Sequence, residues 1–233
     1  MNTQDNTPSA RMKPAKVIGI ICALTLILTA VILQSEAKPA GTTDVTMVPV
    51  SAPDHIRGNP QAPVQIIEYS DLECPFCKEF HVTMSRMFAE YGTTGQVSWV
   101  YRHFPLVQLH KQAVPEAIAT ECVARIAGPD AFWMMIDSIF EITPAGDGLD
   151  LAMLPALAQK SGVTDIAAFK TCYEKQETLP IVQEHMKAGA AAGVQGTPFS
   201  IVTSPSGNRF TINGAYEYDQ VKAIIENALK DTK

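Results

Sequence analysis

Two cysteines separated by two residues mark the most reactive stretch of the sequence, "SDLECPFCKEF". Cys74 and Cys77 enclose only Pro75 and Phe76. Such a pair can hold a metal ion, attach a haem, close a small structural loop or exchange electrons through a reversible disulfide. Haem attachment requires a histidine directly after the second cysteine, but residue 78 is a lysine. A structural bridge across so short a loop would constrain the chain little.

A closed zinc site would need two further ligands, usually a second close pair. The remaining candidates are scattered histidines: His81, His103, His110 and His185. We therefore expect no metal and no cofactor at the Cys74 and Cys77 pair. Redox exchange is the interpretation that the residues favour.

The elements predicted around the pair suit that chemistry. Residues 64–69, "VQIIEY", predict a buried strand, and apolar spacings predict a helix from residue 75 to about residue 91. Cys74 then stands at the helix N-terminus, where unpaired N–H groups and the helix dipole favour a thiolate. Pro75 suits the first turn because its missing N–H would have no partner there. Cys77 lies one turn further, within reach of the Cys74 sulfur.

The amino terminus predicts export. Residues 1–16 are polar and carry Arg11, Lys13 and Lys16, whereas residues 17–33 contain no charge. As a helix, that run spans roughly 25 Å, slightly short of a bilayer core of about 30 Å. We favour an uncleaved anchor; the alternatives are a cleaved signal, with Ser35 and Ala37 as the small residues before the cut, and a buried core helix. Because the basic residues come first, both leading interpretations export everything after residue 37, to a compartment where disulfides persist.

The rest of the chain predicts strands at both ends and helices between them. Residues 34–60 are rich in Pro, Ser, Thr, Ala and Gly and predict a linker, with a short strand near residues 45–50 as the alternative. Residues 97–104 alternate as a second strand, and residues 108 to about 193 give only helical signals. A hairpin over residues 199–212 and a helix over residues 220–230 follow. Without the helical block, the order is that of the two halves of a thioredoxin fold.

Four stretches together resemble the DsbA-like family of exported thiol:disulfide oxidoreductases: "GNPQAPVQIIEYSDLECPFC", "YRHFPL", "GTPFSIV" and "INGAYEY". The resemblance implies an α/β, thioredoxin-like fold with an inserted α-helical domain, preceded by one N-terminal transmembrane or signal helix. The expected division is a cytoplasmic N-terminal segment (1–16), a transmembrane anchor or signal core (17–33), a linker (34–60), the first half of the thioredoxin-like domain (61–107), the helical insertion (108–193) and the second half (194–233).

The resemblance also implies roles for three residues outside the cysteine pair. It places a cis peptide bond between Thr197 and Pro198, facing the pair, where the backbone aligns a substrate chain. From the residues alone, the alternative is a trans proline that starts a strand. It makes Glu68 a proton relay beneath Cys77. The alternative for Glu68 is a partly solvated place on the strand. We consider Arg102 as a partner for its carboxylate.

Cys122 and Cys172 both fall in the helical block. Two cysteines in one exported subdomain predict a structural disulfide; two buried free thiols or a second redox pair are the alternatives. Cys22 lies in the apolar run and predicts no special role.

We predict an exported oxidase that introduces disulfides into reduced or unfolded exported proteins through Cys74 and Cys77. The implied partners are those substrates, a membrane redox partner resembling DsbB, and the membrane itself through the N-terminal helix. A reductase or isomerase of the same fold is the nearest alternative, and a metal chaperone or peptide-binding module is the alternative from another class. The net charge of −6 gives no electrostatic reason to expect nucleic acid.

Overall fold

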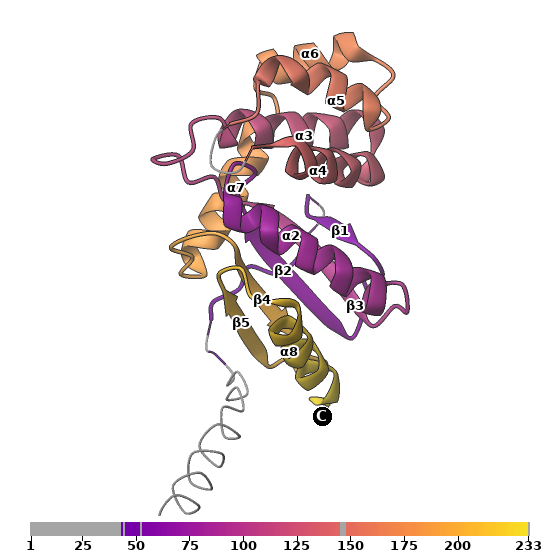
Figure 1. The fold of residues 1–233 in the computed structure, drawn as a ribbon, viewed down its shortest axis with the longest axis vertical. Helices are drawn as coiled ribbons and strands as arrows, with labels where there is room; N and C mark the ends of the chain where they lie inside the picture. Colours follow the sequence, from indigo (N-terminus) through magenta and orange to yellow (C-terminus); the bar gives the residue numbers. More distant parts are fainter. Residues whose placement is uncertain (1–42, 44, 52, 145–147, 233) are drawn as a thin grey trace, which may run out of the picture. The chain divides into compact units, whose positions relative to one another are not determined.

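Two parallel strands connected by one helix carry the cysteine pair. β2 (Val64–Ser70) and β3 (Val97–His103) lie side by side, and α2 (Pro75–Met87) with a short π-helical turn (Phe88–Gly92) connects them (Figure 1). The computed structural model describes residues 43, 45–51, 53–144 and 148–232. Apolar residues on both faces of β2 and β3 explain why these strands lie at the centre of the sheet.

A hairpin and a helix complete the fold. β4 (Phe199–Thr203) runs antiparallel to β2 and to β5 (Arg209–Asn213), and α8 (Tyr218–Lys230) follows. On the other edge, β1 (His55–Arg57) runs antiparallel to β3, so that the order across the mixed sheet is β1-β3-β2-β4-β5. This is the thioredoxin-like α/β fold that the sequence predicted.

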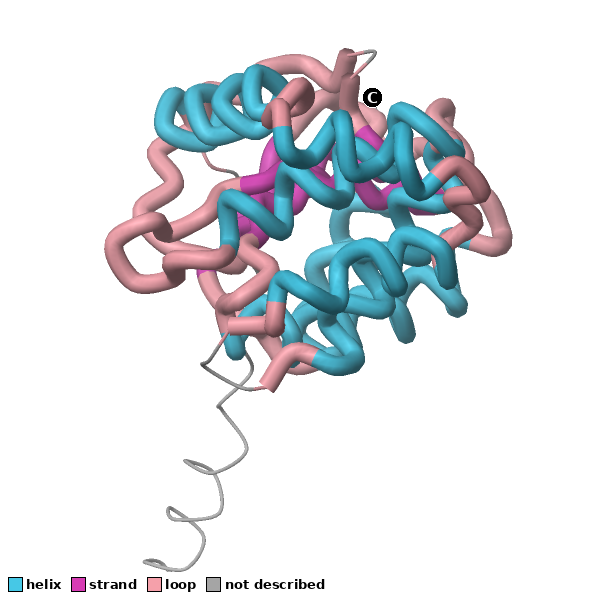
Figure 2. The backbone as a smooth tube through the Cα atoms, turned by 90° about the horizontal axis from the view of Figure 1, so that it is seen from above, coloured by secondary structure: helices cyan, strands magenta, loops and turns pink. Residues whose placement is uncertain are grey.

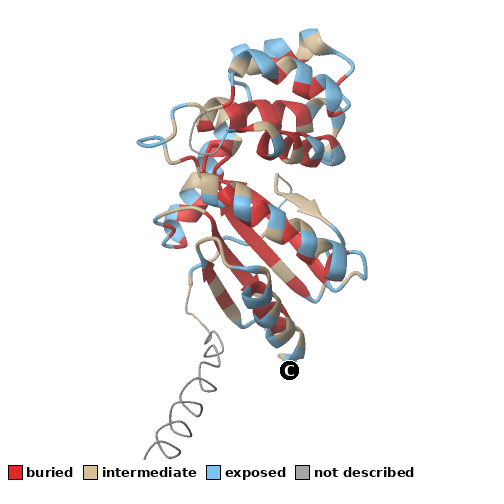
Figure 3. Ribbon diagram, in the orientation of Figure 1, coloured by how far each residue is buried: buried red, intermediate tan, exposed pale blue. Residues whose placement is uncertain are grey.

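Side chains alternate between two faces of the sheet, and each face is covered by helices. Ile66 of β2 belongs to the larger core cluster with residues of α2 and α8, whereas Ile67 packs on the other face with residues of α7 (Leu179–Ala191). Figure 2 shows helical segments on both sides of the strands, and Figure 3 shows that the central strands are buried. Since Glu68 is two positions after Ile66, it must face α2, which carries the cysteines.

The described residues between β3 and β4 are helical wherever they form regular structure. The helices are α3 (Ala113–Ala127), α4 (Pro129–Ile142), a 3-10 turn (Leu151–Met153), α5 (Leu154–Lys160), α6 (Ile166–Glu174) and α7. Gly128 separates α3 from α4 with a φ of 89°, which a residue with a Cβ adopts rarely. Pro129 then starts α4, where a missing N–H costs nothing.

The segment before β2 differs from the expected linker over residues 34–60. Its residues 55–57 form β1, and the short strand considered near residues 45–50 does not form. Val45, Met47 and Val50 instead pack against the smaller core cluster. The segment is therefore part of the folded domain from at least residue 45.

Arg102 explains why this segment is held in place. Its buried guanidinium donates to both carboxylate oxygens of Asp54 at 2.7 and 2.8 Å. It also donates to the carbonyl oxygens of Val48 and Pro49 at 2.9 and 3.0 Å. A buried guanidinium needs such acceptors, and residues 48–54 supply them. Arg102 is thus not the partner of Glu68 that the sequence suggested, because the two side chains lie on opposite faces of the sheet.

Among the helices that the structure describes, none is both long and apolar enough to cross a membrane. The expected anchor or signal at residues 17–33, and Ser35 and Ala37 after it, lie outside the described residues.

Candidate active site

Cys74 and Cys77 lie where β2 leads into α2. Cys74 is the N-cap residue of the helix, with extended backbone, and Pro75 occupies the first turn. Both cysteines are free thiols; Cys74 keeps 4% of its surface exposed and Cys77 keeps none. Both cysteines are therefore buried, and Cys74 is the one of the two that keeps any exposed surface.

The two thiols differ strongly in acidity. The pKa of Cys74 is lowered to about 6, first because the Cys77 thiol donates a hydrogen bond to the Cys74 thiolate, and further because the backbone N–H groups of Cys77 and Phe76 donate to it; burial opposes the shift. Burial is the main reason that the pKa of Cys77 lies well above its ordinary value, and the neighbouring Cys74 thiolate raises this pKa further. Near neutral pH the reduced pair thus holds one thiolate and one thiol.

A loop from the opposite half of the fold closes over Cys74. The peptide bond between Thr197 and Pro198 is cis, and the carbonyl oxygen of Thr197 lies 3.5 Å from the Cys74 sulfur. The N–H of Gly214 donates to the carbonyl oxygen of Pro198 at 3.0 Å, which fixes the loop against the end of β5. Backbone groups of this loop are therefore held next to the reactive sulfur.

Glu68 is fully buried on the face of β2 that α2 covers. The indole N–H of Trp99 donates to one carboxylate oxygen at 2.8 Å, and the other oxygen has no partner among the described residues. Burial raises the pKa of Glu68 to about 7, although the nearby Ser70 hydroxyl and the hydrogen bond from Trp99 oppose the shift. Its charge also raises the pKa of Cys77. A carboxyl group that exchanges its proton near neutral pH thus lies close to the buried cysteine.

Two acidic residues just before Cys74 were not singled out from the sequence. Asp71 has a fully buried side chain and accepts hydrogen bonds from the N–H of Leu106 at 2.7 Å and from His110 at 2.8 Å. Glu73 accepts from the N–H of Gln112. These carboxylates attach the loop between β3 and α3 to the turn that carries the cysteines. The only sequence signal is the acidic character of "SDLEC", which does not reveal its distant partners.

A family model described as thioredoxin matches residues 51–227. The chain belongs to the thioredoxin family. The DsbA-like resemblance is confirmed by solved structures with the same fold: BdbD from Bacillus subtilis (TM-score 0.70, 23% identity, 83% of this chain and 100% of that one) and DsbA2 from Pseudomonas aeruginosa (TM-score 0.63, 25% identity, 80% and 98%). Family, fold and a free cysteine pair at a helix start together support thiol:disulfide oxidoreductase activity.

Curated relatives of this thioredoxin-family chain are named as Na⁺/H⁺ antiporters. NhaA 3 of Salinispora tropica is 29% identical over 188 residues, which cover 80% of this chain and 26% of that protein. NhaA 1 of Mycolicibacterium gilvum is 39% identical over 87 residues, which cover 37% of this chain and 13% of that protein. The chain spans only about a quarter of the length of the first of these relatives, and the match gives no reason to assign it antiport.

The other two cysteines of the described residues lie away from this site. Cys122 of α3 and Cys172 of α6 form a disulfide across a sequence separation of 50. They are 0% and 4% exposed, respectively. The bridge connects two helices of the helical block.

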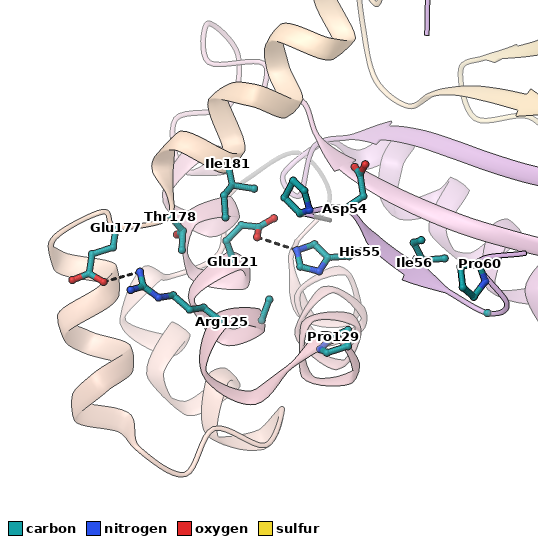
Figure 4. Close-up of a pocket in the computed structure, with 13 residues that line it drawn as sticks. Asp54, His55, Ile56, Pro60, Glu121, Arg125, Pro129, Glu177, Thr178 and Ile181 are labelled. Carbon is teal, nitrogen blue, oxygen red and sulfur yellow. Dashed lines mark hydrogen bonds and ion pairs between the residues drawn. The ribbon is translucent and has the colours of Figure 1, made fainter. Parts of the chain in front are cut away.

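A cavity of about 690 Å³ lies between residues 53–60, α3 and the start of α7 (Figure 4). Its walls include a hydrogen bond between His55 and Glu121 at 2.9 Å and an ion pair between Arg125 and Glu177 at 2.8 Å. No cysteine lines it. The cavity is therefore separate from the site formed by Cys74 and Cys77.

Proposed function

We propose that this chain is an exported oxidase that introduces disulfides into reduced proteins through Cys74 and Cys77. The observation that carries the proposal is the contrast in acidity between the two thiols. A dithiol whose reduced form is stabilised gives up its disulfide easily and is therefore a strong oxidant. A Cys74 pKa of about 6 means that most of the reduced protein carries the stabilised thiolate at neutral pH.

The reaction transfers two electrons from the substrate to the cysteine pair. A substrate thiolate attacks the Cys74 sulfur, the bond between Cys74 and Cys77 breaks, and a mixed disulfide forms at Cys74. A second substrate thiolate then attacks the substrate sulfur and releases Cys74 as a thiolate, which leaves readily because its pKa is low. The substrate gains one disulfide, and the protein becomes a dithiol.

Glu68 serves in this scheme as the proton relay for Cys77. The Cys77 sulfur leaves as a thiolate in the first step, and its raised pKa makes it take up a proton. A buried carboxyl with a pKa of about 7 can supply that proton without opening the core to water. The carbonyl of Thr197 and its neighbours offer an extended substrate a backbone to pair with, which places few demands on substrate sequence.

The proposal includes the setting of the reaction. Residues 17–33 export the domain, as an anchor or as a cleaved signal; residues 61–107 and 194–233 act as the thioredoxin-like domain, and residues 108–193 as its helical insertion. Reoxidation of the dithiol requires an electron acceptor, for which a quinone-linked membrane protein resembling DsbB fits. The substrates are reduced proteins outside the cytoplasm.

The reduction potential of the pair tests the direction of the reaction. Equilibration with glutathione should give a value less negative than about −200 mV, because the reduced form is stabilised. A value near about −270 mV, the range of cytosolic reductants, would overturn the oxidase in favour of a reductase. Oxidation of a reduced two-cysteine peptide, with Cys74→Ser as the inactive control, distinguishes either enzyme from a binding module whose pair never cycles.

A further inference from the structure

His110 has a role in the structure that neither its sequence position nor the cysteine motif predicts. The Nδ1 atom of its ring lies 2.8 Å from a carboxylate oxygen of Asp71. A carboxylate can only accept, so Nδ1 carries the proton. Asp71 in turn contacts both cysteines through its backbone: its N–H donates to the Cys77 sulfur at 3.4 Å, and its carbonyl accepts from the N–H of Cys74 at 3.1 Å. Asp71 thus forms hydrogen bonds both with the imidazole and with the two cysteines.

The loop that presents His110 is held firmly against the start of α2. The N–H of Phe104 donates to the carbonyl of Ser70 at 2.7 Å, and the N–H of Leu106 donates to Asp71 at 2.7 Å. The N–H of His110 donates to the carbonyl of Leu106 at 2.9 Å. Figure 1 shows this loop, between β3 and α3, beside the N-terminal end of α2. The backbone of His110 is thus anchored next to the start of α2, and the hydrogen bond with Asp71 orients its ring.

The charges around His110 favour its protonated form. Burial lowers its pKa, but the hydrogen bond and charge of Asp71 outweigh this, and the charges of Cys74 and Glu73 add to them, so that the pKa is raised overall. Glu116 of α3 also faces this group of carboxylates. Burial, with the charges of Glu73 and Asp71, raises the pKa of Glu116 to about 8, so near neutral pH it is mostly uncharged.

We propose that His110, held by Asp71, supplies the positive charge that stabilises the Cys74 thiolate from outside the Cys-Pro-Phe-Cys sequence. The side chain of Phe76 has no group that can donate to the thiolate, so neither side chain of the dipeptide supplies a positive charge. The charge of Asp71 would by itself disfavour a thiolate nearby, and the imidazolium offsets it. His110 is a positioning residue in this scheme, since it acts through Cys74 and does not react. The proposal rests on the proposed exchange at Cys74.

The first experiment replaces the imidazole and titrates Cys74. Thiolate absorbance near 240 nm, in protein reduced at Cys74 and Cys77, should show a Cys74 pKa higher by roughly one unit in His110→Gln, because an opposite charge close by shifts a pKa by that order. If the Cys74 pKa rises from about 6 to about 7, the stabilisation of the reduced form at pH 7 falls about fivefold. Glutathione equilibration should then show a reduction potential that is more negative by about 20 mV. The matched control is Lys111→Gln, which removes an exposed cation at the next position.

The second experiment reads the same coupling from the histidine. Coupling between two protonation sites is reciprocal, so the pKa of His110, followed by NMR, should be higher in the reduced protein than in the disulfide form. His110→Lys should restore part of the low Cys74 pKa, which a purely structural role of the ring would not allow. Denaturation of oxidised His110→Gln, in which no thiolate exists, measures any structural cost separately.

Three outcomes would overturn the proposal: an unchanged Cys74 titration in His110→Gln, an equal shift in Lys111→Gln, or a His110 pKa that ignores the redox state of the pair. These outcomes are independent of the direction of the reaction. A wild-type potential in the reductase range would remove the oxidase but leave the coupling between His110 and Cys74 measurable. If the protein is strongly oxidising but His110 and Cys74 show no coupling, only the proposed role of His110 is refuted.

Discussion

Replacement of Glu68 by glutamine should make the stability of the protein depend differently on pH. The substitution keeps the shape of the side chain and an oxygen that can accept the indole N–H of Trp99, now 2.8 Å from the carboxylate. It removes a group whose pKa burial raises from the ordinary 4.5 to about 7. The oxidised protein is the suitable form, because Cys74 and Cys77 do not titrate when they are joined.

The sign and size of the effect follow from proton linkage. Below pH 4.5 the folded and unfolded chains both keep the proton of Glu68, so the group does not affect stability. Between that pH and about 7, only the unfolded chain releases the proton, and each pH unit costs the wild type about 1.4 kcal/mol. Glu68→Gln escapes this loss. Its free energy of unfolding, relative to wild type, should therefore rise by about 3 kcal/mol from pH 4.5 to pH 8.

Urea unfolding at pH 4.5, 6 and 8 measures this difference, since all other titrating groups are common to both proteins. The matched control is Glu174→Gln, an exposed glutamate on α6, whose difference from wild type should stay nearly constant over the same range. A constant difference for Glu68→Gln as well would refute the reasoning, because Glu68 would then ionise as easily in the core as in water.

Three further predictions concern the cysteines and export. Phe76→His should lower the Cys74 pKa further and make the reduction potential less negative by about several tens of millivolts, because an imidazolium can donate to the thiolate. Glutathione equilibration measures the potential, and an unchanged value would show that the dipeptide does not tune the pair. Joint replacement of Cys122 and Cys172 by alanine should cost about 4 kcal/mol and lower the melting temperature by about 10 °C, while peptide oxidation persists. Alkylatable thiols at both positions in the exported protein would contradict the bridge. Alkaline phosphatase fused after residue 40 should be active, and an inactive fusion would argue against export.

Periodicity and motif predicted the elements that carry the cysteine pair. The apolar run of β2, the alternation in β3 and the hairpin near the carboxyl end have strong local signals, and their order defines the fold. The part of the predicted linker that forms β1 was misjudged because three residues among prolines and polar residues give no strand pattern; β3 supplies their partners. Arg102 was wrongly paired with Glu68 because the face of the sheet on which a side chain lies follows only from the pairing of the neighbouring strands.

The chemistry of the site was predicted less completely than its position. The helix N-terminus suggested a low pKa for Cys74. In the structure, the largest cause of that low pKa is the hydrogen bond from the Cys77 thiol, and Cys77 keeps its proton because it is fully buried. The contact between Asp71 and His110 joins residues 39 positions apart. No spacing rule connects them, because a loop after β3 has to fold back over the turn before α2.

The bridge between Cys122 and Cys172 bears on how the protein comes into being. Both sulfurs are buried once α3 and α6 have packed, so an oxidant reaches them only in the nascent, incompletely folded chain. If the chain is the oxidase proposed above, its own maturation needs the reaction that it catalyses. A mature copy acting on a newborn one would make production of the protein autocatalytic: reduced chains would mature after a lag, and a trace of finished protein would abolish it.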